Sequence, residues 1–179
     1  LSVSALSLPA QHAHGLALNN INLELRAGEV LGIAGVAGNG QDELFASLSG
    51  EVLAPHAGAI ALDGVAVGQA GINERRRRGA AFVPEERLGH GAAPAMRLSE
   101  NALLSGHATN GFLRHGLVDR AKLTDFVGKV VRAFDVRKGP ADPEARALSG
   151  GNLQKFVIGR EIARQPGILV VAQPSWGVD

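Results

Sequence analysis

Glycines are closely spaced in the segment GVAGNGQDEL, residues 35–44, which follows the apolar run 30–34 and precedes a segment with helical spacing. Glycines in such a place let backbone N–H groups approach phosphate oxygens, and the helix N-terminus that follows adds partial positive charge. The sequence therefore predicts a phosphate-binding loop. Its candidate residues are Gly35, Gly38, Asn39, Gly40, Gln41 and Asp42.

Two residues of this loop lack the chemistry that nucleotide binding needs. Gly35 and Gly40 keep the spacing of a Walker A loop, which also requires a lysine for the phosphates and a hydroxyl for magnesium. Gln41 brings a donor without charge, and the negative charge of Asp42 costs roughly 1 to 4 kcal/mol beside a phosphate. The alternative is a turn in which Asp42 only stabilises the helix N-terminus; a dinucleotide-binding fingerprint fits the spacing poorly.

A second group of candidate residues lies in LSGGNLQK, residues 148–155. A serine and two glycines precede a segment with helical spacing, so a second helix N-terminus is placed to bind phosphate. A plain N-cap serine followed by two flexible glycines is equally consistent with these residues.

Both groups need strands and turns to position them. Residues 21–25 alternate between apolar and polar side chains as in a half-buried strand, and 30–34 suit a strand that is buried on both faces. A hairpin with a two-residue turn at Asp63–Gly64 is expected after the first helix. A further strand is expected at 80–83, and a second buried strand is expected at 168–171.

Helical patterns occupy most of the remaining chain, above all between Glu86 and Leu148. Ser99 is the expected N-cap of one of these helices. The four arginines of 75–78 are interpreted as the solvated face of a helix end. Helices are expected at 41–50, 73–79, 98–104, 119–136 and 151–165. Together these elements predict an α/β sheet fold with an inserted helical subdomain.

Composition excludes several classes of function. The 179-residue chain has a formal net charge of +1, no cysteine and no tyrosine. These numbers argue against a nucleic-acid-binding surface, a disulfide framework and a thiolate metal site. No apolar run approaches the roughly 18 residues that span a bilayer. The six histidines lack metal-ligand spacing, so no metal site is predicted.

The distances between LSGGNLQK, the strand after it and the glycine loop are similar to those in the nucleotide-binding domain of ATP-binding cassette (ABC) ATPases, over the whole chain. The segments GIAGVAGNGQDEL, FVPEERLGHG, LSENALL, LSGGNLQK and AQPSWGVD resemble more closely the second nucleotide-binding domain of the fused, two-domain ATPases of bacterial monosaccharide and nucleoside importers. Gly-Asn-Gly-Gln together with Ala-Gln-Pro favours the nucleoside importers.

The resemblance implies a P-loop NTPase-like α/β core sheet with an antiparallel β subdomain and an inserted helical subdomain. It also implies that the chain is one truncated domain in three parts. These parts are a core with the β subdomain (1–85), the helical subdomain (86–147), and the signature helix with the Walker B strand (148–179).

The resemblance also assigns roles to residues. Domains of this family pair head to tail, so the signature motif of this chain would contact ATP that is bound to its partner. The signature residues are Leu148, Ser149, Gly150, Gly151, Asn152 and Gln154. Glu85, Glu86 and Arg87 lie where the family couples to its membrane subunits, with a charged surface loop as the alternative. ATP with Mg²⁺ is the ligand implied for the intact transporter.

Several residues of the family's own ATP site are missing here. The family's Walker B strand ends in aspartate and glutamate, where this chain has Ala172 and Gln173. Alanine cannot hold a metal ion, and glutamine at the general-base position cannot accept a proton from water. No aromatic residue precedes Phe45 to stack on adenine, and His12 and His14 are weak substitutes. With the altered glycine loop, these losses predict a degenerate site without a catalytic residue.

The implied partners are the first nucleotide-binding domain of the same polypeptide, the transmembrane permease subunits and, indirectly, a substrate-binding protein, without nucleic acid. The implied location is the cytoplasmic face of the inner membrane, as a peripheral subunit. One alternative is a soluble ABC-type ATPase acting in translation or DNA repair, and another is a structural half that binds no nucleotide. Trp176 is assigned either to the interface with the sister domain or to the core.

Overall fold

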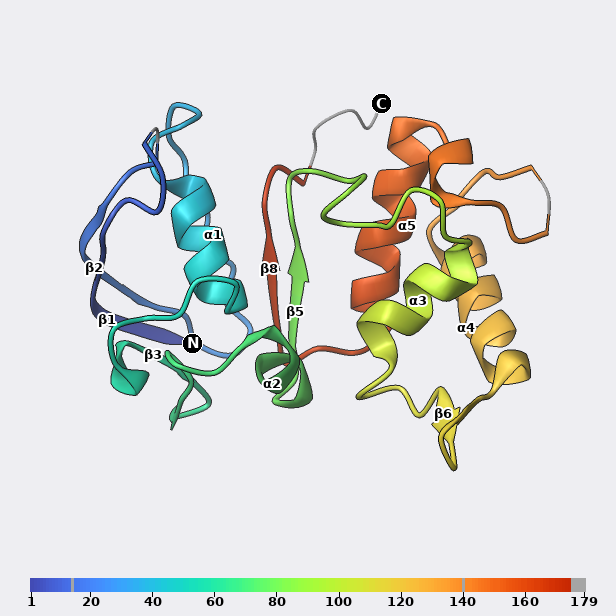
Figure 1. Ribbon diagram of the computed structural model, residues 1–179, viewed down its shortest axis with the longest axis horizontal. Coiled ribbons are helices and arrows are strands. Elements are labelled where there is room, and N and C mark those ends of the chain that lie inside the picture. Colours follow the sequence, from blue (N-terminus) through green and yellow to red (C-terminus); the bar gives the residue numbers. More distant parts are fainter. Residues whose placement is uncertain (14, 140, 175–179) are drawn as a thin grey trace. The chain divides into compact units, whose positions relative to one another are not determined.

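The computed structural model describes residues 1–13, 15–139 and 141–174 (Figure 1). The chain folds into two compact units, Leu1–Arg78 and Gly79–Asp179, here called the N-terminal and the C-terminal unit. Each unit is described by itself.

A four-stranded antiparallel sheet forms the N-terminal unit, in the order β2-β1-β3-β4. The strands are β1 (Ser2–Leu8), β2 (Leu18–Glu24), β3 (Ile60–Leu62) and β4 (Val65–Ala66). The half-buried strand expected near 21–25 is confirmed as β2, whereas β1 was not predicted. The turn at Asp63–Gly64 is also confirmed, because both residues have the positive φ angles (47° and 74°) that a two-residue hairpin turn requires.

Two helices accompany this sheet, and both were expected from the sequence. Helix α1 (Gln41–Ser49) directly follows the glycine loop and ends at Gly50, which adopts the left-handed conformation (φ 87°) that commonly terminates helices. A 3₁₀ turn, η1 (Ala57–Ala59), precedes β3, and α2 (Ile72–Arg77) closes the unit. Helix α1 therefore has a defined start at the loop and a defined end.

Arg75 of α2 corrects the prediction that all four arginines of 75–78 face solvent. Its side chain is fully buried, and its guanidinium donates to the carbonyl oxygens of Ser47 and Leu48 at the C-terminus of α1, and to those of Gly68 and Ala70. A cation at this end is favourable because the last carbonyls of a helix carry partial negative charge. Burial lowers the pKa of Arg75 to about 10.

The strand expected at 30–34 is wrong for the described structure. These residues adopt no regular secondary structure, and Val30 is 99% exposed. A strand buried on both faces needs a hydrogen-bonded neighbour. Within the described part of the N-terminal unit, the four strands pair only with one another, and none of them pairs with this apolar run.

In the C-terminal unit a parallel strand pair carries three helices (Figure 1). The strands expected at 80–83 and 168–171 are confirmed as β5 (Ala80–Val83) and β8 (Ile168–Val171), and they pair in parallel. Strand β5 is buried, whereas β8, which was expected to be buried, is half-buried. The helices are α3 (Leu98–Gly106), α4 (Arg120–Ala133) and α5 (Gly150–Ile162). A short hairpin of β6 (Leu113–Arg114) and β7 (Leu117–Val118) separates α3 from α4, and the 3₁₀ turn η2 (Ala145–Ala147) precedes α5.

An apolar core joins these helices to β5. It includes Leu98, Phe112, Val130 and Phe156, all at most 1% exposed. Ser99 was predicted to be the N-cap of α3, and this prediction is wrong. The N-cap is Arg97, and Ser99 lies inside the first turn of the helix. Ser99 instead donates its hydroxyl to Asp142, which also accepts the Ser99 backbone N–H. The serine was misplaced because the acceptor for this helix end lies 43 residues away in the chain.

Candidate functional site

The glycine loop brings its six predicted residues together at the N-terminus of α1. Gly38 and Gly40 have positive φ angles of 79° and 98°, which side chains rarely tolerate, so glycine is needed at both positions. Gly40 is the N-cap of α1 and provides no side chain to satisfy the first N–H groups of the helix. The loop therefore has the backbone geometry that anion binding uses.

Gln41 fills this loop with its own side chain. Its Oε1 accepts the backbone N–H of Asn39 at 2.9 Å, and its Nε2 donates to the carbonyl oxygen of Val36 at 3.0 Å. Asn39 Nδ2 donates to the same carbonyl at 2.9 Å. A Cβ at Gly35 would lie only 2.6 Å from Gln41 Nε2, so the carboxamide packs directly on that glycine. The backbone N–H of Asn39, which could otherwise donate to a phosphate oxygen, is therefore already bonded to Gln41.

Acidic side chains follow the loop in the first turn of α1. Asp42 is exposed there, beside Glu43. Both favour the positive end of the helix, and Glu43 Oε1 also accepts the backbone N–H of Leu16 at 2.8 Å. Negative charge at this point opposes a phosphate group, in agreement with the alternative that Asp42 serves the helix.

The signature residues form the start of α5, with Ser149 as its N-cap and Gly150, Gly151 and Asn152 as its first turn. The Ser149 hydroxyl makes no capping hydrogen bond to the helix backbone. Instead Ser149 Oγ accepts from Asn152 Nδ2 at 2.8 Å, while Asn152 Oδ1 accepts the backbone N–H of Arg137 at 2.7 Å. The exposed first turn thus keeps N–H groups that no side chain caps.

Gln154 differs from the other predicted signature residues. Its side chain is 2% exposed, and its Oε1 has no hydrogen-bond partner among the described residues. It therefore lies in the interior, and the surface at the start of α5 belongs to Ser149, Gly150, Gly151 and Asn152.

Glu85, Glu86 and Arg87 lie in the loop after β5, and this loop returns to the start of α5. The backbone N–H of Gly91 donates to the carbonyl of Glu86 at 2.8 Å, which closes the turn. A Cβ at Gly150 would lie 2.7 Å from Arg87 Nη1, so the guanidinium packs against the first residue of α5. Two segments that the sequence treated as separate sites are therefore neighbours.

The end of β8 does not supply magnesium ligands. Ala172 is held by its backbone N–H, which donates to the carbonyl of Val83 at 2.9 Å, and its methyl side chain offers no donor atom. Gln173 follows with φ 47° and an exposed side chain. A methyl group and a carboxamide do not fit a magnesium site. The expectations for His14 and Trp176 lie outside the described residues.

A buried polar cluster on α5 was missed by sequence reasoning. Arg160 and Glu161 are at most 4% exposed, and Asn101 of α3 is 1% exposed. Adjacent opposite charges within an otherwise apolar helical pattern, at 160 and 161, were the available signal, since such charges are rarely buried unless paired.

Comparison of the chain with known proteins identifies the family to which these motifs belong. Residues 18–175 match the family model described as ABC transporter. The glucose import ATP-binding protein TsgD13 of Haloferax volcanii is 40% identical over 165 residues, which are 91% of this chain and 30% of that protein. The guanosine import ATP-binding protein NupO of Bacillus subtilis is 35% identical over 162 residues, 90% of this chain and 32% of that protein. The chain thus spans about a third of the length of these curated relatives.

A solved structure shares the fold. The dimeric, post-hydrolysis state of the ATP-binding cassette MJ0796, bound to ADP and Pi, matches with a TM-score of 0.80 at 20% identity, covering 99% of this chain and 75% of that chain. The match confirms the predicted α/β P-loop fold with an antiparallel β subdomain and helices. The family model matches residues 18–175, which are most of this chain, so the chain belongs to the ABC transporter family.

Proposed function

We propose that the chain is the second nucleotide-binding half of an importer ATPase for nucleosides or monosaccharides. Relatives named for glucose and guanosine import support this substrate range, and the nucleoside substrate that the motifs favour stays a prediction. Those relatives are about three times as long as this chain, which leaves room for a first nucleotide-binding half.

The first turn of α5 carries the proposal. Ser149, Gly150 and Gly151 would contact the γ-phosphate of an ATP molecule held by the Walker residues of the sister half. The N-terminus of α5 attracts the negative charge, and the uncapped N–H groups and the serine hydroxyl supply donors. Because these donors are fixed before ATP arrives, contact with the phosphate closes the two halves, and closure drives the change in the permease.

The chain's own loop would bind nucleotide weakly or not at all. Gln41 already occupies a donor of the loop, and Asp42 adds like charge. With Ala172 and Gln173 after β8, this chain would add neither a magnesium ligand nor a general base. ATP and Mg²⁺ would be held by the sister half. A half that binds no nucleotide is the second candidate, and the closure of the loop by Gln41 favours it.

The proposed partners are the sister half, the permease subunits and, indirectly, a substrate-binding protein. Glu85, Glu86 and Arg87 would face the permease, and the protein would then lie at the cytoplasmic face of the membrane as a peripheral subunit. None of the helices in the described ranges has the length and apolar character needed to cross a bilayer.

Replacing Ser149 in the assembled transporter tests the proposal. Ser149→Ala should lower ATP turnover about ten-fold or more, because one preorganised donor to the phosphate is lost. The matched control is Ser4→Ala, an exposed serine on β1, which should leave the rate unchanged. Equal rates for the wild type and Ser149→Ala would overturn the assignment of α5 to an ATP site.

A further inference from the structure

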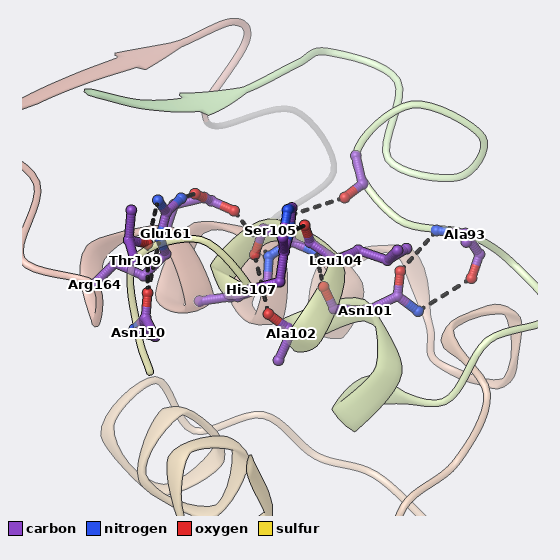
Figure 2. Close-up of polar contacts among 12 residues, drawn as sticks. Ala93, Asn101, Ala102, Leu104, Ser105, His107, Thr109, Asn110, Glu161 and Arg164 are labelled. Atoms are coloured by element: carbon purple, nitrogen blue, oxygen red, sulfur yellow. Dashed lines mark hydrogen bonds and ion pairs between the residues drawn. The ribbon is translucent and has the colours of Figure 1, made fainter. Parts of the chain in front are cut away.

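A buried ion-pair cluster links α5 to α3 and to the segments on either side of α3. Glu161, which is fully buried, lies between Arg160 of the same helix and Arg164, which follows the end of that helix. Its Oε1 accepts from Arg160 Nε at 2.9 Å, and its Oε2 accepts from Arg164 Nη1 at 2.6 Å. Figure 2 shows Glu161 and Arg164 beside Thr109 and Asn110, and Asn101 beside Ala93.

The two arginines extend in different directions from this carboxylate. Arg164 donates to Asn110 Oδ1 at 3.3 Å and to Thr109 Oγ1 at 3.1 Å, just after α3. Arg160 donates to the carbonyl oxygens of Asn101 at 3.3 Å and Gly91 at 3.0 Å. The guanidinium of Arg160 therefore holds α5, α3 and the loop before α3 in one arrangement.

Gly91 is the residue that closes the loop of Glu86 and Arg87. Its N–H donates to the carbonyl of Glu86, while its carbonyl accepts from Arg160. A Cβ at Gly91 would lie 3.1 to 3.3 Å from the backbone of residues 86 and 87, so the turn is tightly packed at this point. A displacement of Gly91 thus reaches Glu86 through one hydrogen bond.

Asn101 fixes the other side of the same segment. Its Oδ1 accepts the backbone N–H of Ala93, and its Nδ2 donates to the carbonyls of Ala93, Met96 and Arg97. Arg160 holds the backbone carbonyl of Asn101 itself. The segment from 91 to 97 is therefore attached to α5 at Gly91 and to α3 at Ala93, Met96 and Arg97.

Burial of two arginines with one carboxylate is a costly way to stabilise a fold, since apolar side chains of similar volume often do as well or better. What the guanidinium of Arg160 adds is geometry, because its fork donates to two carbonyls and one carboxylate at fixed angles. The free-energy cost of burying these charges is consistent with a need to hold α5, α3 and the loop before α3 in one arrangement.

We infer that Arg160 is a positioning residue that joins the signature helix to the loop of Glu86 and Arg87, so that movement of α5 on ATP contact is passed to that loop. The inference rests on the proposed function, in which this loop faces the permease and α5 faces the ATP of the sister half.

A spin label on the loop tests the attachment without any assay of transport. These 179 residues contain no cysteine, so Leu88→Cys, an exposed site in the loop, is the one position among them that takes the label. Arg160→Met should raise the mobility of the label. Arg164→Met is the matched control, because it removes a buried arginine from the same carboxylate but leaves the contact with Gly91, and label mobility should stay unchanged. Equal mobility in both variants would overturn the inference.

Arg160→Lys keeps the positive charge and therefore guards against loss of folding. Its single ammonium group cannot reproduce the forked hydrogen bonds of the guanidinium, so the attachment to Gly91 and Asn101 is still weakened. In the assembled transporter, Arg160→Lys should reduce the stimulation of ATP turnover by loaded binding protein about three-fold or more, while Arg164→Lys reduces it less. Unchanged stimulation in Arg160→Lys would overturn the inference. The proposed function fails separately, since it fails only if Ser149→Ala leaves the turnover of the otherwise unchanged transporter intact.

Discussion

Asn152 donates a hydrogen bond from its side-chain amide to Ser149 Oγ, at 2.8 Å, in the first turn of α5. The orientation of the amide is fixed because Asn152 Oδ1 accepts the backbone N–H of Arg137. A serine oxygen that already accepts one hydrogen bond can still donate its own proton. Ser149 Oγ therefore accepts from Asn152 and not from its own helix backbone, and its hydroxyl proton stays available for a phosphate oxygen.

Removing this amide should disturb Ser149 rather than the fold. In Asn152→Ala, Ser149 Oγ is free to cap the first turn, and ATP turnover of the assembled transporter should fall about ten-fold, the worth of one well-placed hydrogen bond. A double-mutant cycle with Ser149→Ala measures the effect. Once Ser149 is alanine, Asn152→Ala should add little. Full additivity of the two losses would contradict the relationship.

Opening the glycine loop should increase its affinity for nucleotide. Gln41→Ala releases the N–H of Asn39 and the carbonyl of Val36, and a fluorescent ATP analogue should bind about ten-fold more tightly, as expected for one or two hydrogen bonds that no longer compete. Gln69→Ala is the control, because Gln69 bonds to Pro55 in the same unit, away from the loop. Identical titrations for the wild type and both variants would show that Gln41 does not close the site.

Arg75 should contribute more to stability than its neighbours in the basic run. Arg75→Met leaves buried carbonyls at the end of α1 without a donor and should lower the free energy of unfolding by about 2 to 4 kcal/mol. Arg77→Met, which removes only an exposed ion pair with Glu74, should cost less than about 0.5 kcal/mol. Chemical denaturation of both variants checks the difference, and equal losses would contradict it.

The pH dependence of this effect follows from the lowered pKa of Arg75, about 10. Because burial disfavours the charged form, the folded state releases this proton before the unfolded state does. The contribution of Arg75 to the free energy of unfolding therefore rises as the pH increases through about 10, and this contribution is constant below that value. The loss in Arg75→Met should thus be the same at about pH 6 and at about pH 8, both well below the folded pKa. Denaturation at these two values measures it, and a marked difference would contradict the assignment.

Two glycines in helix interiors should respond to alanine in opposite directions. A Cβ at Gly159 of α5 would lie 2.5 Å from the ring of Phe134, so Gly159→Ala should destabilise by about 1 to 3 kcal/mol. A Cβ at Gly128 of α4 meets only the flexible end of Arg132, at 3.3 Å, so Gly128→Ala should stabilise by about 0.5 to 1 kcal/mol. Thermal unfolding of the pair tests this, and a shift of the same sign in both would be contrary to it.

Local patterns in the sequence identified the elements whose signals are local. The turn at Asp63–Gly64, the end of α1 at Gly50 and the existence of strands at 80–83 and 168–171 all follow from turn chemistry and short apolar runs. The prediction of a strand at 30–34 was wrong because a strand forms only where another strand pairs with it. The residue types of a segment do not reveal whether such a partner is present.

The sequence alone determined the chemistry that each site holds: a glycine loop with Gln41 in place of lysine, a serine before two glycines, and Ala172 where the family has a carboxylate. Only the tertiary structure decided what those side chains do. Gln41 turns back on its own loop and Arg160 reaches Gly91, 69 residues earlier. Hydrogen bonds between distant residues depend on the packing of whole elements, which no local pattern of residue types encodes.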